Sequence, residues 1–404
     1  MQKKYSLAYS VTSLFILLGI LFIAFPFYLF PYQQQITEKI FGPLIGFTAR
    51  QVFDIPPKST LVHSDAVAMY VLVLLLFLLA ILLALLMRYV QGVKRWESKV
   101  LSIIRVVACY YLALMLMKYG LDKVFKAQFY LPEPNTLYTP LGMVDKDLLY
   151  WSSMGTSRFY NICMGGAEVL AALLLLFRRT RMAGILLSIA IMAQVVMINF
   201  GFDISVKVYS LFLLFIGLYL LHPYYRRLYH FLFLGKNETR PTVELSFIRQ
   251  PFVYVFLKCL VAGIILLESF YPYMRRGNYN DDTAARPYLH GAYQVTGMIA
   301  GGDTLQPAAF PVKRFFVHRR GYLIFQDQQD KMQDFHFTYN KQTNAFIITD
   351  YQLREIPLRV QYDAADSVIT LQFMKDSVPV QLTGKGLNWR QLPALRKLFH
   401  FTVD

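Results

Sequence analysis

Ionisable side chains within long apolar segments are the strongest candidates for chemistry in this sequence. Glu168 lies near the middle of the apolar segment 159–177 and follows the small residues Gly165, Gly166 and Ala167. A charged group inside a bilayer is costly, so such a carboxyl is protonated, paired with a cation or exposed to a wet cavity. We therefore expect Glu168 to be an intramembrane proton acceptor, the catalytic group of the site. The alternative is an ion pair or hydrogen bond that fixes helix packing, in which case an apolar replacement should cost little stability.

A second group of candidates comes from the apolar segment 101–121 and its end. Lys118 and Asp122 are four residues apart, which places them on one face of a helix, and Lys123 follows directly. At the mouth of a helical bundle these charges could bind an anionic headgroup or a ring carbonyl. Arg105 lies about one turn inside the segment, where it could bind a ligand or extend its long side chain to the membrane surface.

Two tyrosines of the same segment, Tyr110 and Tyr111, are expected near the depth of Glu168. They are candidate ligand-binding residues, although packing in the core is the commoner role of such rings. Lys258 and Glu268 lie near the two ends of a later apolar segment, so we expect both to reach the membrane surfaces without a functional role.

Several kinds of chemistry are not indicated. No histidine lies in the interior of an apolar segment, so neither a haem nor a buried zinc or iron site is expected. The cysteines show no C-x-x-C spacing and fall in apolar segments, which argues against disulfides and thiol redox motifs; they are Cys109, Cys163 and Cys259. Phosphate-binding loops and serine-hydrolase motifs are missing from the sequence.

The composition indicates a polytopic membrane protein. Of the 404 residues, 56% are hydrophobic and 16% are charged, whereas soluble chains are roughly half apolar and a quarter charged. A membrane-spanning helix needs about 20 apolar residues. Seven segments meet this need, at 6–30, 66–88, 101–121, 159–177, 182–200, 206–222 and 252–271.

The net charge of +16 is best explained by membrane orientation. Basic residues gather in the short loops between apolar segments, so we expect no nucleic-acid partner. They are concentrated on the side that holds the N-terminus, which favours a cytoplasmic N-terminus, and an odd number of spans then places the C-terminus outside. Arg275 and Arg276, just after the last span, mildly favour the opposite orientation.

The C-terminal part of the chain has a different pattern. We expect a membrane domain at 1–276, a linker at 277–284 and an independently folding extracytoplasmic β-domain at 285–404. Eight short alternating runs separated by turns predict an all-β antiparallel barrel or sandwich; they begin near Tyr293, Phe315, Tyr322, Phe335, Ala345, Leu358, Ser367 and Val378. Two long loops, 31–65 and 122–158, are expected to be folded and to cap the outer face of the bundle.

The segment 100–222 resembles the DoxX family of membrane proteins. The family pattern is R…G-x-x-K…E-x-x-G-G-x-x-L-L…T-R, and the matching residues are Arg105, Gly120, Lys123, Glu168 and the following Leu-Leu-Leu-Leu-Phe-Arg-Arg-Thr-Arg. Ala171-Ala172 stands where the family has two glycines. The resemblance implies a DoxX-like four-helix core within an α-helical bundle of about seven helices. The chain is also similar to larger Bacteroidetes-type members, which end in an extracytoplasmic β-rich tail.

The resemblance further implies a place in a bacterial inner membrane and a possible role in quinone-linked redox. No cofactor is expected other than a lipid quinone, and a partner redox subunit would have to complete the reaction. The alternative is a non-enzymatic scaffold or a small-solute transporter whose β-domain binds an envelope protein. The residues alone leave open whether the protein is an enzyme.

Overall fold

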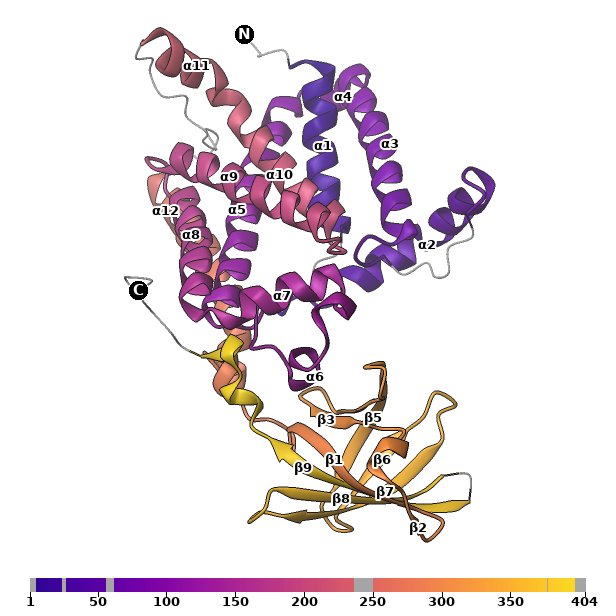
Figure 1. The fold of residues 1–404 in the computed structure, drawn as a ribbon. Helices are drawn as coiled ribbons and strands as arrows, with labels where there is room; N and C mark the ends of the chain where they lie inside the picture. Colours follow the sequence, from indigo (N-terminus) through magenta and orange to yellow (C-terminus); the bar gives the residue numbers. More distant parts are fainter. Residues whose placement is uncertain (1–4, 24–26, 56–61, 236–249, 376, 397–404) are drawn as a thin grey trace. The chain divides into compact units, whose positions relative to one another are not determined.

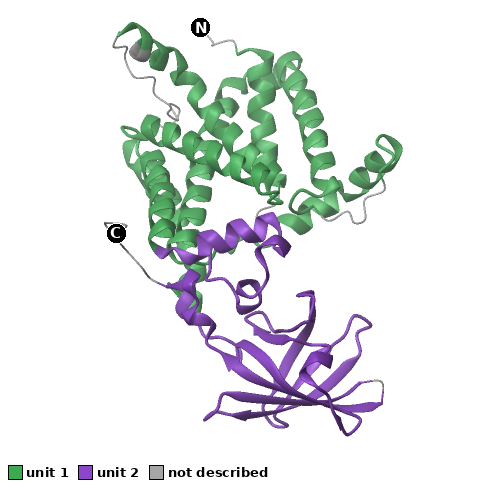
Figure 2. Ribbon diagram, in the orientation of Figure 1, with its two compact units in different colours: residues 1–128, 159–279 green, residues 129–158, 280–404 purple. Residues whose placement is uncertain are grey.

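The computed structural model describes residues 5–23, 27–55, 62–235, 250–375 and 377–396. The chain forms two compact units, which Figure 2 distinguishes by colour. Residues 1–128 and 159–279 form the first, here called the helical unit. Residues 129–158 and 280–404 form the second, here called the barrel unit. The expected boundary near 277–284 is close to the second division, but 129–158 belongs with the barrel although it lies between two helices in sequence.

The helical unit confirms the predicted α-helical bundle (Figure 1). Its helices are α1 (Leu7–Phe22), α2 (Gln33–Gln51), α3 (Val67–Tyr89), α4 (Gln91–Lys94), α5 (Glu97–Val124), α8 (Arg158–Leu176), α9 (Arg181–Gly201), α10 (Lys207–Leu221), α11 (Tyr225–Leu234) and α12 (Pro251–Arg276).

Six helices in the described part of the chain are long and apolar enough to cross a membrane. They are α3, α5, α8, α9, the stretch Lys207–His230, which comprises α10 and the first part of α11, and the stretch Pro251–Thr283, which begins with α12. The first predicted span corresponds to α1, which is apolar but has only 16 residues. Residues 24–26 of that predicted span lie outside the described residues.

The long helix α5 organises the helical unit because α1, α10 and α12 all pack against it. Its buried positions include the small residues Ala108, Ala113 and Gly120, which let neighbouring helices approach closely. Residues 31–65, predicted to be folded, contain α2, which packs on α1 and α3. Thr37, Phe41 and Ile45 are buried on its inner side.

The barrel unit confirms the predicted all-β domain. Its strands are β1 (Gly291–Ala300), β2 (Asp303–Thr304), β3 (Arg314–His318), β4 (Tyr322–Gln326), β5 (Met332–Asn340), β6 (Ala345–Thr349), β7 (Glu355–Asp363), β8 (Val368–Lys375) and β9 (Val378–Leu387). From β3 onward each strand pairs antiparallel with the next, and β1 pairs with both β3 and β9. The sheet therefore closes into a barrel of eight strands, with the short β2 attached to β1. These eight strands correspond to the eight predicted runs.

Residues 129–158 complete the outer face of the barrel. Phe315 and Phe316 are consecutive in β3, so they point to opposite faces, yet both are fully buried. Phe315 lies in the barrel core, whereas Phe316 belongs to a second cluster that includes Leu131 and Tyr138. Gln326 of β4 donates a hydrogen bond of 3.1 Å to the carbonyl of Tyr138. Helix α6 (Pro134–Leu137), a 3₁₀ turn at Leu141–Met143 and α7 (Lys146–Thr156) are thus parts of the barrel unit.

This packing changes the expectation that the β-domain folds alone. We expect a fragment of residues 280–404 to be less stable by roughly 3 kcal/mol or more than the same fragment with residues 129–140 joined by a flexible linker. Burial of even one or two large apolar side chains against Phe316 is worth about this much. Thermal unfolding followed by circular dichroism measures the difference. The control is the joined fragment with Leu131→Ser, and equal melting of all three proteins would contradict the prediction.

Candidate functional site in the helical unit

The C-terminal end of α5 meets α8 and α12 in a group of polar side chains. We call this group the α5 charge cluster; it consists of Lys118, Asp122 and Lys123 from α5, Glu168 from α8, and Glu268 and Tyr273 from α12. All of these residues are buried except Asp122, which is partly exposed. Four of the six are predicted site residues; Glu268 was expected to lack a functional role, and Tyr273 was not predicted.

The first contact in the cluster is a buried ion pair between α5 and α8. Lys123 Nζ lies 2.9 Å from each carboxylate oxygen of Glu168, whose residue is only 2% exposed. The two helices touch directly here, because a Cβ added to Gly120 would lie 2.7 Å from the carbonyl oxygen of Gly165. A Cβ on Gly120 would also meet Val169, one turn after Gly165, and a Cβ on Gly165 would meet Val124, one turn after Gly120. Each glycine therefore lies beside both the opposite glycine and the turn that follows it, which requires the two helices to be antiparallel.

Antiparallel packing explains why this lysine and this glutamate meet. In a helix each Cα–Cβ bond tilts toward the N-terminus, so side chains on antiparallel helices lean toward each other. Lys123 is one turn after Gly120, and Glu168 is one turn after Gly165. Their side chains therefore converge at the level of the two glycines. Gly165, one of the small residues that precede Glu168, thus allows α8 to approach α5 closely.

The second contact joins α5 to α12. Lys118 Nζ lies 2.7 Å from Glu268 Oε1, and both side chains are buried. Glu268 also accepts hydrogen bonds from the backbone N–H groups of Tyr28 at 2.7 Å and Leu29 at 2.9 Å. The ring of Tyr28 lies over Lys118, with 4.8 Å between Nζ and the ring centroid. Glu268 therefore holds the segment after α1 across the ends of α5 and α12.

This geometry corrects the expectation that Glu268 merely reaches the membrane surface. The residue is 2% exposed and makes three charge-assisted or backbone hydrogen bonds. A signal in the sequence was available: Lys118 lies inside an apolar segment and needs a buried carboxylate, and the segment 252–271 contains one acid. The need for a buried carboxylate identifies Glu268 as a candidate partner of Lys118, but it does not show how α12 packs against α5.

The third contact is a hydrogen bond from the hydroxyl of Tyr273 to Asp122 Oδ1. The ring of Tyr273 packs on Phe125, with 4.6 Å between centroids. Sequence reasoning missed Tyr273, because a tyrosine near the end of an apolar helix is typical of the membrane interface. The side-chain hydrogen-bond donor to Asp122 is therefore a neutral phenol, whereas the side-chain donors to Glu168 and Glu268 are ammonium groups.

The remaining predicted site residues lie away from the cluster. Tyr111 precedes Lys123 by about 18 Å along α5 at 1.5 Å per residue, and its hydroxyl is 2.8 Å from that of Tyr209. The expectation that Tyr110 and Tyr111 lie near the depth of Glu168 is therefore wrong. Arg105 lies still earlier on α5 and donates hydrogen bonds to the hydroxyl of Tyr9.

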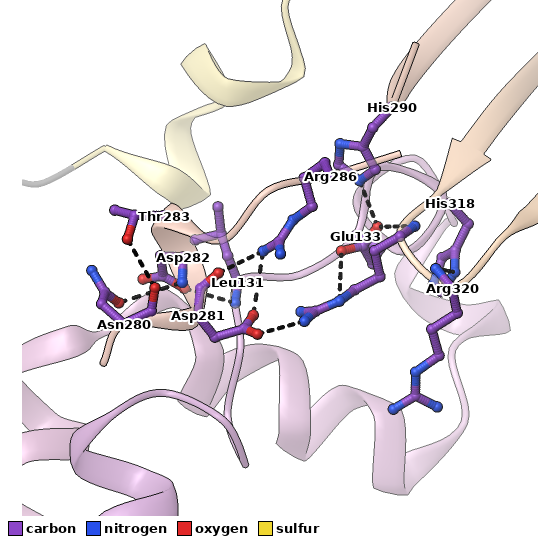
Figure 3. Close-up of polar contacts among 11 residues, drawn as sticks. Leu131, Glu133, Asn280, Asp281, Asp282, Thr283, Arg286, His290, His318 and Arg320 are labelled. Carbon is purple, nitrogen blue, oxygen red and sulfur yellow. Dashed lines mark hydrogen bonds and ion pairs between the residues drawn. The ribbon is translucent and has the colours of Figure 1, made fainter. Parts of the chain in front are cut away.

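The barrel unit has its own polar cluster, shown in Figure 3. Glu133 Oε2 lies 2.8 Å from His290 Nε2 and 3.2 Å from the backbone nitrogen of Arg319. The guanidinium of Arg319 is 2.6 Å from Asp281 Oδ1, and Arg286 is 3.3 Å from the other oxygen of that carboxylate. These contacts tie the segment before α6 and the linker to the barrel.

Three groups in this cluster have shifted pKa values. Burial would lower the pKa of Arg319, but its hydrogen bond to Asp281 and the charge of that carboxylate raise it above the usual value. Burial would raise the pKa of Glu133, but the hydrogen bond from His290 and nearby positive charge outweigh it and hold the pKa below its usual range. Burial lowers the pKa of His318, and the positive charge of Arg320 adds to this effect against the opposing charge of Glu133. Glu133 is 4% exposed, so the cluster is suited to fixing the fold. Among the described residues, no group of His, Cys, Asp and Glu side chains has the arrangement of a metal site.

Comparison with known proteins gives one informative similarity. The chain is 35% identical over 111 residues to a protein of Bacillus subtilis (strain 168) called uncharacterized protein YwoB. The aligned part is 28% of this chain and 70% of YwoB. No protein-family model matches the chain. No solved structure matches it.

Proposed function

This chain belongs to the same family as YwoB of Bacillus subtilis, and we propose that it is a membrane protein that exchanges protons with a lipid quinone at the α5 charge cluster. The proposal includes a DoxX-like role in quinone-linked redox. A quinone takes up electrons and protons in equal number when it becomes a quinol. The described helices supply groups for the protons, and a partner redox subunit supplies or accepts the electrons.

The charge balance of the cluster is the observation that carries this proposal. Three carboxylates lie with two ammonium groups. Each ammonium is within hydrogen-bond distance of a glutamate, so these four charges cancel in pairs. The remaining carboxylate, Asp122, accepts a hydrogen bond from the hydroxyl of Tyr273. Its charge is compensated at longer range by Lys118, Lys123 and the exposed Arg276. The hydrogen-bond donor to Asp122 is a phenol and not an ammonium group, and Asp122 is partly exposed, so it is the carboxylate of the cluster best placed to exchange a proton.

The proton-accepting role expected for Glu168 moves to Asp122 in this proposal. Both oxygens of Glu168 accept from Lys123, so a proton on Glu168 would compete with a buried ion pair. Once Asp122 is protonated, the hydroxyl of Tyr273 can turn and donate to a quinone carbonyl. Asp122 is also the partly exposed member of the cluster, which gives a proton a route to it.

The same proposal places the protein in a bacterial inner membrane, with a cytoplasmic N-terminus and the barrel unit in the periplasm. The concentration of basic residues in the N-terminal-side loops supports this orientation. The barrel would then present an extracytoplasmic surface to the redox partner or to another envelope protein.

Quinone bound to the purified protein tests the proposal. We expect the wild-type protein to copurify with quinone, measured by mass spectrometry, and to melt at a higher temperature when quinone is added. Asp122→Asn and Tyr273→Phe should each lower the quinone content at least about tenfold, equivalent to ~1.4 kcal/mol of binding free energy. Both replacements keep the size of the side chain, so the helices should still fold.

The matched control is Tyr111→Phe, which removes a buried hydrogen bond from the same helix outside the cluster. This variant should keep its quinone. A wild-type protein with no quinone and no thermal response would overturn the proposal and favour a scaffold or a transporter. Equal loss of quinone in Tyr111→Phe would show that general destabilisation, and not the cluster, explains the result.

A further inference from the structure

The short helix α11 has a strongly two-sided surface. Tyr225, Tyr229 and Phe233 recur at every fourth position and form one stripe, and the rings of Tyr229 and Phe233 pack with centroids 5.2 Å apart. Arg226 and Arg227 fall beside and opposite this stripe. Such a pattern, with aromatic residues on one side and basic residues on the other, is typical of helices that lie in a membrane interface.

The aromatic stripe is exposed in the helical unit. Tyr225 is 55% exposed, Tyr229 is 54% exposed and Phe233 is 73% exposed. Figure 1 shows α11 extending from α10 at the end of the bundle where α1 begins. The helix ends at Gly235, whose positive φ of 63° and N–H bond to the carbonyl of His230 form a helix-terminating cap.

The length of the preceding helix puts α11 at the level of the lipid headgroups. Residues 207–224, which comprise α10 and the following 3₁₀ turn at His222–Tyr224, span about 27 Å at 1.5 Å per residue. The hydrocarbon core of a bilayer is about 30 Å thick. A helix that enters the core at Lys207 therefore reaches the opposite edge within the first turn of α11.

The charge on this side of the bundle is positive. Arg178 and Arg179 lie in the exposed connection between α8 and α9, which chain connectivity places on the same membrane side as α11. Arg226 and Arg227, on α11 itself, form a basic border beside the aromatic stripe. Anionic phospholipid headgroups are complementary to such a border, and each basic residue near the surface adds to the attraction.

We propose that α11 is a docking surface for anionic phospholipid, with its aromatic stripe in the acyl boundary and its arginines on the headgroup phosphates. This assignment is independent of the quinone proposal, because it uses a different helix at the other end of α5. It would anchor the connection between α10 and α12 to the membrane surface.

Nitroxide labels in the reconstituted full-length protein test the proposal. Cys163 and Cys259 are exposed and are first replaced by Ser, and single cysteines are then placed at positions 226, 227, 229 and 233. In vesicles that contain phosphatidylglycerol, labels at 229 and 233 should be accessible to oxygen, and labels at 226 and 227 to a water-soluble nickel complex. In pure phosphatidylcholine the ratio of oxygen to nickel accessibility at 229 should fall severalfold.

The paired variant Arg226→Gln, Arg227→Gln should lose roughly tenfold of its preference for phosphatidylglycerol over phosphatidylcholine, as measured by the lipids retained in native mass spectrometry. Arg178→Gln, Arg179→Gln is the matched control on the same membrane side and should lose less. Equal accessibility at all four labels would overturn the proposal, as would indifference to phosphatidylglycerol. Labels at 229 and 233 that neither reagent reaches would show that protein, not lipid, covers the stripe.

Discussion

Replacing Glu168 with Leu is expected to destabilise the helical unit by about 3–5 kcal/mol, because it leaves the ammonium group of Lys123 buried without its carboxylate. Lys123 Nζ contacts both oxygens of Glu168 at 2.9 Å, and the residue is only 6% exposed. Unfolding in detergent, followed by temperature or by denaturant, measures the loss. This result would reverse the expectation from sequence that an apolar replacement costs little.

The double variant Glu168→Leu, Lys123→Met distinguishes the effect of the two charges on stability from the effect of the volume that their side chains fill. Removal of both charges also removes their desolvation cost, so the double variant should recover most of the stability lost by the single one. Glu168→Gln, which keeps the shape but not the charge, should lie between the two. If the single and double variants were equally unstable, the pair would not be the reason for the loss.

Replacing Gly165 with Leu is expected to separate α5 from α8 and to cost more than about 3 kcal/mol, because the new side chain meets backbone that cannot move away. A Cβ at this position would lie against the carbonyl oxygen of Gly120 and 2.9 Å from Val124 Cγ2. The helices would have to move apart at the level where Lys123 and Glu168 meet. We therefore expect loss of folded protein and, in what remains, loss of the contact between Lys123 and Glu168.

The neighbouring glycine provides the matched control. Among the residues that the structure describes, no heavy atom outside its own helix turn lies within 4 Å of a Cβ built on Gly166, and this position is exposed. Gly166→Leu has the same change in helix propensity and side-chain size, yet it should unfold at close to the wild-type temperature. Both proteins can be compared by thermal unfolding in the same detergent. Similar losses in the two variants would contradict the direct contact between α5 and α8.

Local pattern is enough to locate most elements of this protein. Runs of apolar residues long enough to cross a bilayer mark the long helices, and short β-rich runs separated by turns mark the eight barrel strands. The same reasoning shows that Lys118 and Glu168 need partners, since an unpaired charge inside a bilayer is too costly. The period of a helix does not show which other helix supplies the partner.

The partners were decided by contacts between residues that are far apart in the chain. Lys118 pairs with Glu268, and Asp122 takes the hydroxyl of Tyr273, although about 150 residues separate α5 from α12. The segment after Phe129 was likewise assigned to the membrane domain from its position between two apolar runs, yet it covers Phe316 of the barrel. Which helices touch, and which loop covers an apolar face, depends on the packing of whole elements, and no local spacing of residues records it.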